Sequence, residues 1–412
     1  MNSSQAFMTR TAFWLTGGAA LTVLFSIAAS QILLGLAFAA LMFSGERLRL
    51  PPIRLPLVLF MAGTLLSLAL SGDPASGRPQ IRKFFVFLTL LTVFSTFRNL
   101  THVRRLVLCW AGAGAFVAAR GLAQFSEKLH EARLLGLNFY EYYVGERITG
   151  FMSHWMTFGG QLMIVLILVA AFVLFSPRAR GRLLWLCVLC SVPLLGSLLL
   201  GFTRSIWLAS AVAAVYLVWF RRRAFLLAVP VLLALGFWLG PDSVRSRVVS
   251  MFKPRGEMDS NQHRIICWRT GWEMIKAHPW FGLGPEQARI QFDRYVPKDI
   301  PRPLPSGWYG HLHSIYIHYA AERGVPTMLA LVWLLVKILF DFLSAVRRLP
   351  PGPSDEKFLL HGGVAAVLAI MVAGIFELNL GDSEVLTMFL ALTAFGYVAL
   401  GQSRQADLQP VV

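Results

Sequence analysis

With 56% hydrophobic and only 14% charged residues, this chain of 412 residues has a mean hydropathy of +0.61. That composition excludes an ordinary soluble protein and predicts an all-α polytopic membrane protein. A transmembrane β-barrel is excluded because the apolar runs are continuous rather than alternating. The formal charge of +17 does not indicate a nucleic-acid partner, because the basic residues lie in short clusters between apolar segments.

The apolar pattern predicts about twelve transmembrane helices, nine before a long polar segment and three after it. Three regions follow: helices 1–9 in residues 1–240, a large loop at 241–324, and helices 10–12 with a cytoplasmic tail at 325–412. The first two helices share one apolar run, so we expect a tight turn near Ser30-Gln31. The predicted spans are 12–28, 30–44, 55–71, 83–97, 103–125, 155–176, 183–202, 204–220, 224–240, 325–346, 358–379 and 383–401.

Basic residues recur in every second connection between these spans, which is the pattern of cytoplasmic loops. The predicted topology therefore has both termini inside the cell and places residues 72–82, residues 126–154, the short turn at Thr203-Arg204 and the large loop outside. The rule that positive charge favours the cytoplasmic side does not apply to long translocated segments. The basic residues of the large loop therefore do not contradict this topology. The cytoplasmic clusters are Arg47, Arg49 and Arg54; Arg98, Arg104 and Arg105; Arg178, Arg180 and Arg182; Arg221, Arg222 and Arg223; and Arg347, Arg348 and Lys357.

The large loop holds five of the nine histidines and contains two helical signals. Residues 261–277 place Ile265, Trp268, Trp272 and Ile275 at helical spacing, which predicts an amphipathic helix on the membrane surface or over the mouth of the bundle. A second short helix is expected to begin near His313 and lead to the next span.

Three arginines are predicted on the outer face: Arg147, Arg204 and Arg264. Arg204 has apolar sequence on both sides. A charged side chain in such a segment is energetically costly unless it reaches the membrane–water interface or pairs with an opposite charge. Each arginine has two interpretations, an interfacial side chain or a clamp for an anion. The guanidinium group matches phosphate oxygens with two parallel hydrogen bonds.

His311 and His313 resemble the start of a metal site, but the spacing of further ligands does not fit one, and Cys187 and Cys190 have no second pair. We therefore predict no metal and no cofactor. The histidine His313 suits a general base, because an imidazole titrates near working pH. Its alternative role is a structural helix cap.

His313-Ser314-Ile315-Tyr316 and the following Ala321–Pro326 resemble the histidine motif of the O-antigen ligase and polymerase superfamily. Arg264, Trp268 and the segment from His278 to Gly284 resemble its upstream motif. Arg147–Phe151 with His154 resembles a stretch in its earlier outer loop. Ser314 stands where many members have Asn.

The resemblance implies a GT-C-like glycosyltransferase of the Gram-negative inner membrane, with its active site in the periplasm. It assigns the essential histidine to His313 and the diphosphate-binding arginines to Arg204, Arg264 and, less directly, Arg147. His311 and the carboxylates Glu286 and Glu322 are expected to support the site, and the sequence does not choose which carboxylate orients the imidazole.

The function that this resemblance implies is that of an O-antigen ligase. Such an enzyme transfers O-antigen polysaccharide, with inversion and without a metal, from undecaprenyl diphosphate to a sugar of the lipid A-core. The expected partners are that donor, that acceptor and membrane lipids. The alternatives are an O-antigen polymerase and a non-enzymatic transporter of lipid-linked glycans. A transporter would be expected to carry polar residues within several spans.

Overall fold

The computed structural model describes residues 3–227, 242–249, 260–305 and 307–407, together with Ala234 and Trp238. Within these residues the chain is helical and contains no strand. Most of the predicted ninth span, 224–240, lies outside the described residues.

Six helices among the described residues are long and apolar enough to cross a membrane. They are α6 (Leu100–Leu134), α8 (Trp155–Phe175), α9 (Gly181–Leu200), α17 (Val325–Arg348), α18 (Asp355–Phe376) and α19 (Ser383–Asp407). The other helices of the bundle are α1 (Ser3–Thr22), α2 (Ile27–Phe43), α3 (Arg54–Leu70), α5 (Leu88–Thr96) and α10 (Arg204–Arg222). The chain is thus a polytopic helical membrane protein, as its composition predicts.

The centre of the bundle is formed by α8, α18 and α19. In the apolar segments of these helices, 78%, 78% and 89% of the residues are buried. Helices that are apolar on all sides can be buried on all sides. By contrast, only 22% of the residues in the apolar segment of α9 are buried, and its side chains Trp185, Leu189 and Val192 point outward. Such an exposed apolar face fits contact with lipid tails rather than water.

The first two helices meet at a different point from the one predicted. The turn between α1 and α2 comes before residue 27, because the Ser26 side chain accepts a hydrogen bond from the Ala29 backbone N–H at 3.3 Å and caps α2. Ser30 lies inside α2, where its buried hydroxyl donates to the Ala19 carbonyl at 2.8 Å. The prediction of a turn at Ser30-Gln31 was therefore wrong, because Ser30 joins the two helices through a buried hydrogen bond.

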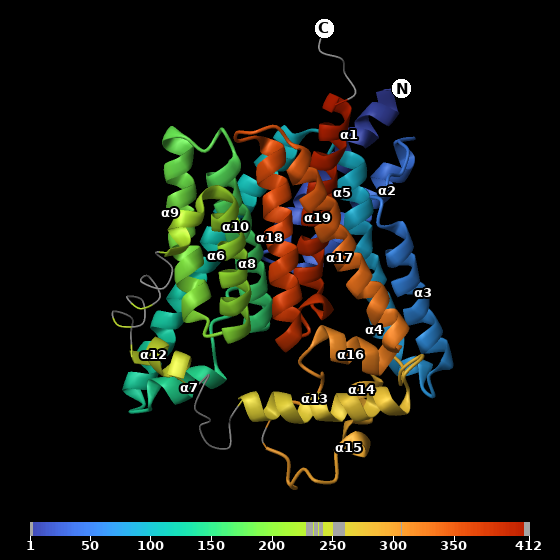
Figure 1. The fold of residues 1–412 in the computed structure, drawn as a ribbon, viewed down its shortest axis with the longest axis vertical. Helices are drawn as coiled ribbons and strands as arrows, with labels where there is room; N and C mark the ends of the chain where they lie inside the picture. The colour runs from blue at the N-terminus through green and yellow to red at the C-terminus, as the bar shows by residue number, and fades with distance from the viewer. Residues whose placement is uncertain are drawn as a thin grey trace.

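The start of α1, the end of α19 and the arginine-rich connections lie at one end of the bundle (Figure 1). The short helices of the long connection lie at the opposite end, where α13 crosses beneath the bundle (Figure 1). They are α12 (Asp242–Val249), α13 (Ser260–Ala277), α14 (Gln287–Ile290), α15 (Phe292–Tyr295) and α16 (Ile315–Arg323). The remaining elements are α4 (Pro74–Arg82), α7 (Phe139–Gly145) and the 3₁₀ turns η1 (Lys83–Phe87), η2 (Arg223–Leu227) and η3 (Asn379–Gly381).

Both helices predicted in the long loop are present, as α13 and α16. The buried face of α13 differs from the predicted stripe, because Ile266, Cys267 and Met274 are buried whereas Ile265 and Trp272 are about half exposed. The helix therefore packs on the bundle through one face and leaves a second, apolar face open.

Two segments that resemble family motifs are bound to each other through their backbones. Leu283 and Gly284 donate to the carbonyls of Ala321 and Glu322 at 2.9 and 2.8 Å, and Val325 donates to the Pro279 carbonyl at 2.8 Å. Gly282 and Gly324 have φ of 67° and 83°, and a Cβ on either would collide with the backbone of the other segment. The close backbone contact explains why both segments need glycine.

Candidate active site

His313 lies in the connection just before α16 and is held through its backbone. Its N–H donates to His311 Nδ1 at 3.2 Å, and its carbonyl accepts a hydrogen bond from Trp268 Nε1 at 3.2 Å. The φ angle of 46° is left-handed, a conformation that costs a non-glycine residue about 1–3 kcal/mol. Next to it, the Ser314 hydroxyl caps α16. These contacts direct the imidazole away from α16 and toward the bundle.

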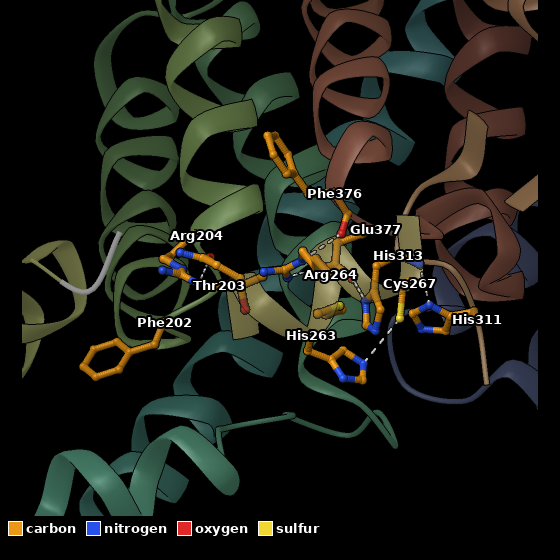
Figure 2. Close-up of polar contacts among 12 residues, drawn as sticks. Phe202, Thr203, Arg204, His263, Arg264, Cys267, His311, His313, Phe376 and Glu377 are labelled. Atoms are coloured by element: carbon orange, nitrogen blue, oxygen red, sulfur yellow. Dashed lines mark hydrogen bonds and ion pairs between the residues drawn. The ribbon is translucent and has the colours of Figure 1, made fainter. Parts of the chain in front are cut away.

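The side chain of His313 faces a carboxylate that the sequence interpretation did not assign to the site. Oε2 of Glu377, at the end of α18, lies 3.4 Å from His313 Nδ1. The other oxygen of Glu377 forms an ion pair with Arg264, whose Nε also donates to the Phe376 carbonyl at 3.2 Å (Figure 2). Glu377 is 3% exposed, and a carboxylate buried to this degree requires such partners.

This arrangement specifies how the imidazole can act. A proton on Nδ1 donates to Glu377, which leaves the lone pair on Nε2. Nε2 of His313 is buried and has no hydrogen-bond partner among the described residues. The arrangement is that of a base held in one tautomer by a carboxylate.

Arg204 is connected to the same helix, α13. It begins α10, and its Nη2 donates to the Asn261 side chain at 2.7 Å. Asn261 precedes Arg264 by one helical turn, so α13 brings the Arg204 and Arg264 side chains toward one another. His313 is joined to Arg264 through Glu377. The structure therefore brings together three residues that the sequence interpretation selected.

Arg147 joins this cationic cluster from the connection between α7 and α8. Its guanidinium lies over the Trp155 ring at 4.9 Å, and its Nε donates to the Val144 carbonyl at 3.1 Å. Burial, followed by repulsion from Arg247 and Arg264, lowers the pKa of Arg147 to about 9. An anion bound nearby would relieve this repulsion.

Arg247, on α12, is a member of the cluster that sequence reasoning missed. It is buried, and its Nε donates to the carbonyl of Phe202, two residues before Arg204, at 2.9 Å. Residues 242–249 contain two arginines, and only the packing of α12 distinguishes buried Arg247 from the more exposed Arg245.

The three residues expected to support the site occupy different places. His311 accepts the hydrogen bond from His313 N–H, and burial, followed by the charge of His313, lowers the pKa of His311 to about 2. Glu286 instead accepts a hydrogen bond from Gln80. The carboxylate of Glu322 lies 3.3 Å from His318 Nε2. The carboxylate in contact with His313 is Glu377, and neither Glu286 nor Glu322 takes that position.

A cavity of about 230 Å³ is lined by Glu377, the carboxylate partner of His313, and by the neighbouring His311. Asp382, in its wall, accepts a hydrogen bond from the Thr157 hydroxyl at 2.7 Å. Burial raises the pKa of Asp382 to about 6. The polar wall includes His154, His311, His318, Glu377, Lys83 and Asp382. Polar groups of this variety suit a ligand that carries hydroxyl groups.

Taken together, the helical bundle and this buried polar cluster define a polytopic membrane protein with a polar site at the end of the bundle opposite the termini. The model of the O-antigen ligase family matches residues 189–332, from α9 into α17. The matched segment contains Arg204, Arg264 and His313, whereas Arg147 and Glu377 lie outside it. No curated protein matches the chain. The match confirms the predicted resemblance to the O-antigen ligase and polymerase superfamily over residues 189–332.

Proposed function

We propose that this protein is an O-antigen ligase that transfers O-antigen polysaccharide from undecaprenyl diphosphate to a sugar of the lipid A-core. The observation that carries the proposal is the bridge made by Glu377, which joins the imidazole of His313 to the guanidinium of Arg264. One carboxylate thus connects a base to a cationic group, and the transfer needs both.

His313 acts as the general base in this proposal. Its Nε2 takes the proton of the acceptor hydroxyl as the hydroxyl oxygen bonds to the anomeric carbon of the donor sugar. Glu377 keeps the proton on Nδ1 and stabilises the imidazolium that forms. A positioned base of this kind contributes about 10²–10⁴-fold in rate.

The arginines bind the leaving group. The bond between the anomeric carbon and the phosphate oxygen breaks, and undecaprenyl diphosphate departs with the electron pair. Arg204 and Arg264, with Arg147 and Arg247 behind them, stabilise the negative charge that grows on that oxygen. Attack from the face opposite the leaving group inverts the anomeric centre. A diphosphate is already a good leaving group, so the reaction needs neither a general acid nor a metal.

The membrane placement belongs to the same proposal. Residues 1–240 and 325–412 would form nine and three transmembrane helices of a GT-C-like fold in the inner membrane of a Gram-negative bacterium, and residues 241–324 the periplasmic loop. The arginine-rich connections and the chain ends share one end of the bundle (Figure 1). Positive charge favours the cytoplasmic side, so the site would face the periplasm.

The lipopolysaccharide profile of a strain that lacks the gene tests this function. A ligase predicts loss of all long chains on the core, with lipid-linked polymer accumulating, and restoration by the wild-type gene but not by His313→Ala. A core with a single repeat would instead identify a polymerase. An unchanged profile would contradict both activities.

A further inference from the structure

A second cluster of chemically active side chains lies beside His313 and has no part in the proposed transfer. His263 and Cys267 project from one face of α13, four residues apart, and His313 faces them from the connection before α16 (Figure 2). One ligand atom from each residue lies within 4.8 Å of the other two. Two donors at this helical spacing and a third from another segment are a common arrangement in metal sites.

The distances are close to those of a coordinated ion. Zn²⁺ binds thiolate sulfur at about 2.3 Å and imidazole nitrogen at about 2.0–2.1 Å, so tetrahedral donors lie about 3.3–3.7 Å apart. Cys267 Sγ is 3.7 Å from His263 Nε2. Side-chain movements of about 1 Å would bring the widest pair into range.

The polar atoms of these side chains are incompletely satisfied. His263 Nδ1 and His313 Nε2 are buried without hydrogen-bond partners among the described residues, although such atoms normally have one. The Trp308 carbonyl lies 3.2 Å from His263 Nε2, a hydrogen bond that the ring gives up when Nε2 binds an ion, and Glu377 lies against His313 Nδ1. A carboxylate on the second nitrogen of a ligating histidine orients that ligand and raises its basicity.

We propose that His263, Cys267 and His313 form a binding site for Zn²⁺, and that the bound ion inhibits transfer. Sulfur and imidazole nitrogen together select a borderline-soft cation of this kind over Mg²⁺ or Ca²⁺. The ion accepts lone pairs from Sγ and from one nitrogen of each histidine, the thiol proton passes to water, and no oxidation state changes. Because the nitrogen of His313 without a partner is Nε2, the ion occupies the lone pair that would remove the acceptor proton.

The binding does not depend on the proposed function, whereas the inhibition rests on it. A metal-independent transferase and an inhibitory ion are compatible, because the enzyme works when the site is empty. Zn²⁺ at this position therefore acts as a reversible block of the imidazole rather than as a cofactor.

Binding is tested on the full-length protein in lipid nanodiscs with Co²⁺ as a spectroscopic probe and Zn²⁺ as its competitor. The wild type should show a cobalt–thiolate charge-transfer band that Zn²⁺ removes, and Cys267→Ser should lack it. His263→Asn should bind Co²⁺ at least about ten-fold more weakly. Mutation of a residue that only hydrogen-bonds to a metal ligand already lowers metal affinity by about 10–100-fold. The controls Cys109→Ser and His130→Asn change exposed residues of the same types and should behave as the wild type. A wild type without the band would overturn the site.

Inhibition is tested by glycan transfer in metal-free buffer and then with added Zn²⁺. The wild type and both controls should lose activity and regain it with a chelator. Cys267→Ser should keep its basal rate and need at least about ten-fold more Zn²⁺ for half-inhibition. A cobalt band with no zinc inhibition would overturn the block. Failure of the wild type to transfer in metal-free buffer would refute the proposed function and leave the binding result intact.

Discussion

Glu377 lies 3.4 Å from the Nδ1 atom of His313, although 64 residues separate them along the chain. The second oxygen of the carboxylate binds Arg264. A group that is 3% exposed therefore couples the candidate base to the candidate phosphate-binding cation. The first three predictions depend on this coupling.

Replacement of His313 by alanine should abolish transfer and leave donor binding intact. The proposed base contributes about 10²–10⁴-fold in rate, whereas the arginines retain the diphosphate. The measurement is attachment of glycan to lipid A-core by purified protein, with donor binding measured separately. His130→Ala, at an exposed position, is the control. Near-normal attachment in His313→Ala would remove the assignment of this residue as the base.

Replacement of Glu377 by glutamine should reduce kcat by about 10²-fold, because the amide neither holds the imidazole tautomer nor balances the imidazolium. The variant should also unfold at a lower temperature, since it leaves the buried Arg264 without its counter-charge. Glu377→Asp should recover part of the activity. The matched control is Glu273→Gln, which removes a partly exposed carboxylate from α13. Equal rates for Glu377→Gln and the control would show that Glu377 does not position His313.

Replacement of Arg264 by lysine should weaken donor binding and transfer by about 10–100-fold, even though the charge is kept. Arg264 already uses Nε for the Phe376 carbonyl and Nη2 for Glu377. An ammonium group lacks the planar set of donors needed to hold these partners and a phosphate together. The control is Arg269→Lys on the exposed side of the same helix. Wild-type kinetics in Arg264→Lys would exclude a bidentate clamp.

The pH dependence of stability should contain a contribution from Asp382. Its pKa is about 6 in the folded protein, above the value of 3.8 for an exposed carboxyl. The unfolded chain therefore ionises first, and the stability contributed by this group is present below pH 4 and lost as the pH rises toward 6.

Asp382→Asn should remove this loss, worth up to about 3 kcal/mol at 1.36 kcal/mol per pKa unit. Its amide oxygen can still accept the hydrogen bond from Thr157. Thermal unfolding of both proteins in detergent between pH 4 and 7 provides the measurement. Parallel curves over this range would contradict the raised pKa.

The amino-acid sequence by itself determined the class of the protein and the order of its helices. Long apolar runs in a chain of this composition form helices that are buried or face lipid. The ends of the predicted spans 155–176 and 183–202 fall within two residues of the ends of α8 and α9. Charge and motif spacing also selected Arg204, Arg264 and His313. Arginine and histidine are residue types suited to binding phosphate and to accepting a proton, and each of the three lies in a recognisable short segment. The turn between α1 and α2 was misplaced because a buried serine resembles a turn residue when only its neighbours are known.

Only the tertiary structure decided which side chains meet. Glu377 was visible in the sequence merely as a charge near the end of a span, and Arg247 as one of several basic residues in the loop. Glu286 and Glu322, nearer in sequence to His313, find partners in Gln80 and His318 instead. Contacts between residues far apart along the chain depend on how α13 crosses the ends of α10 and α18, and local pattern carries no information about that crossing. The positions of Glu377 and Cys267 beside His313 therefore emerge only when the helices pack.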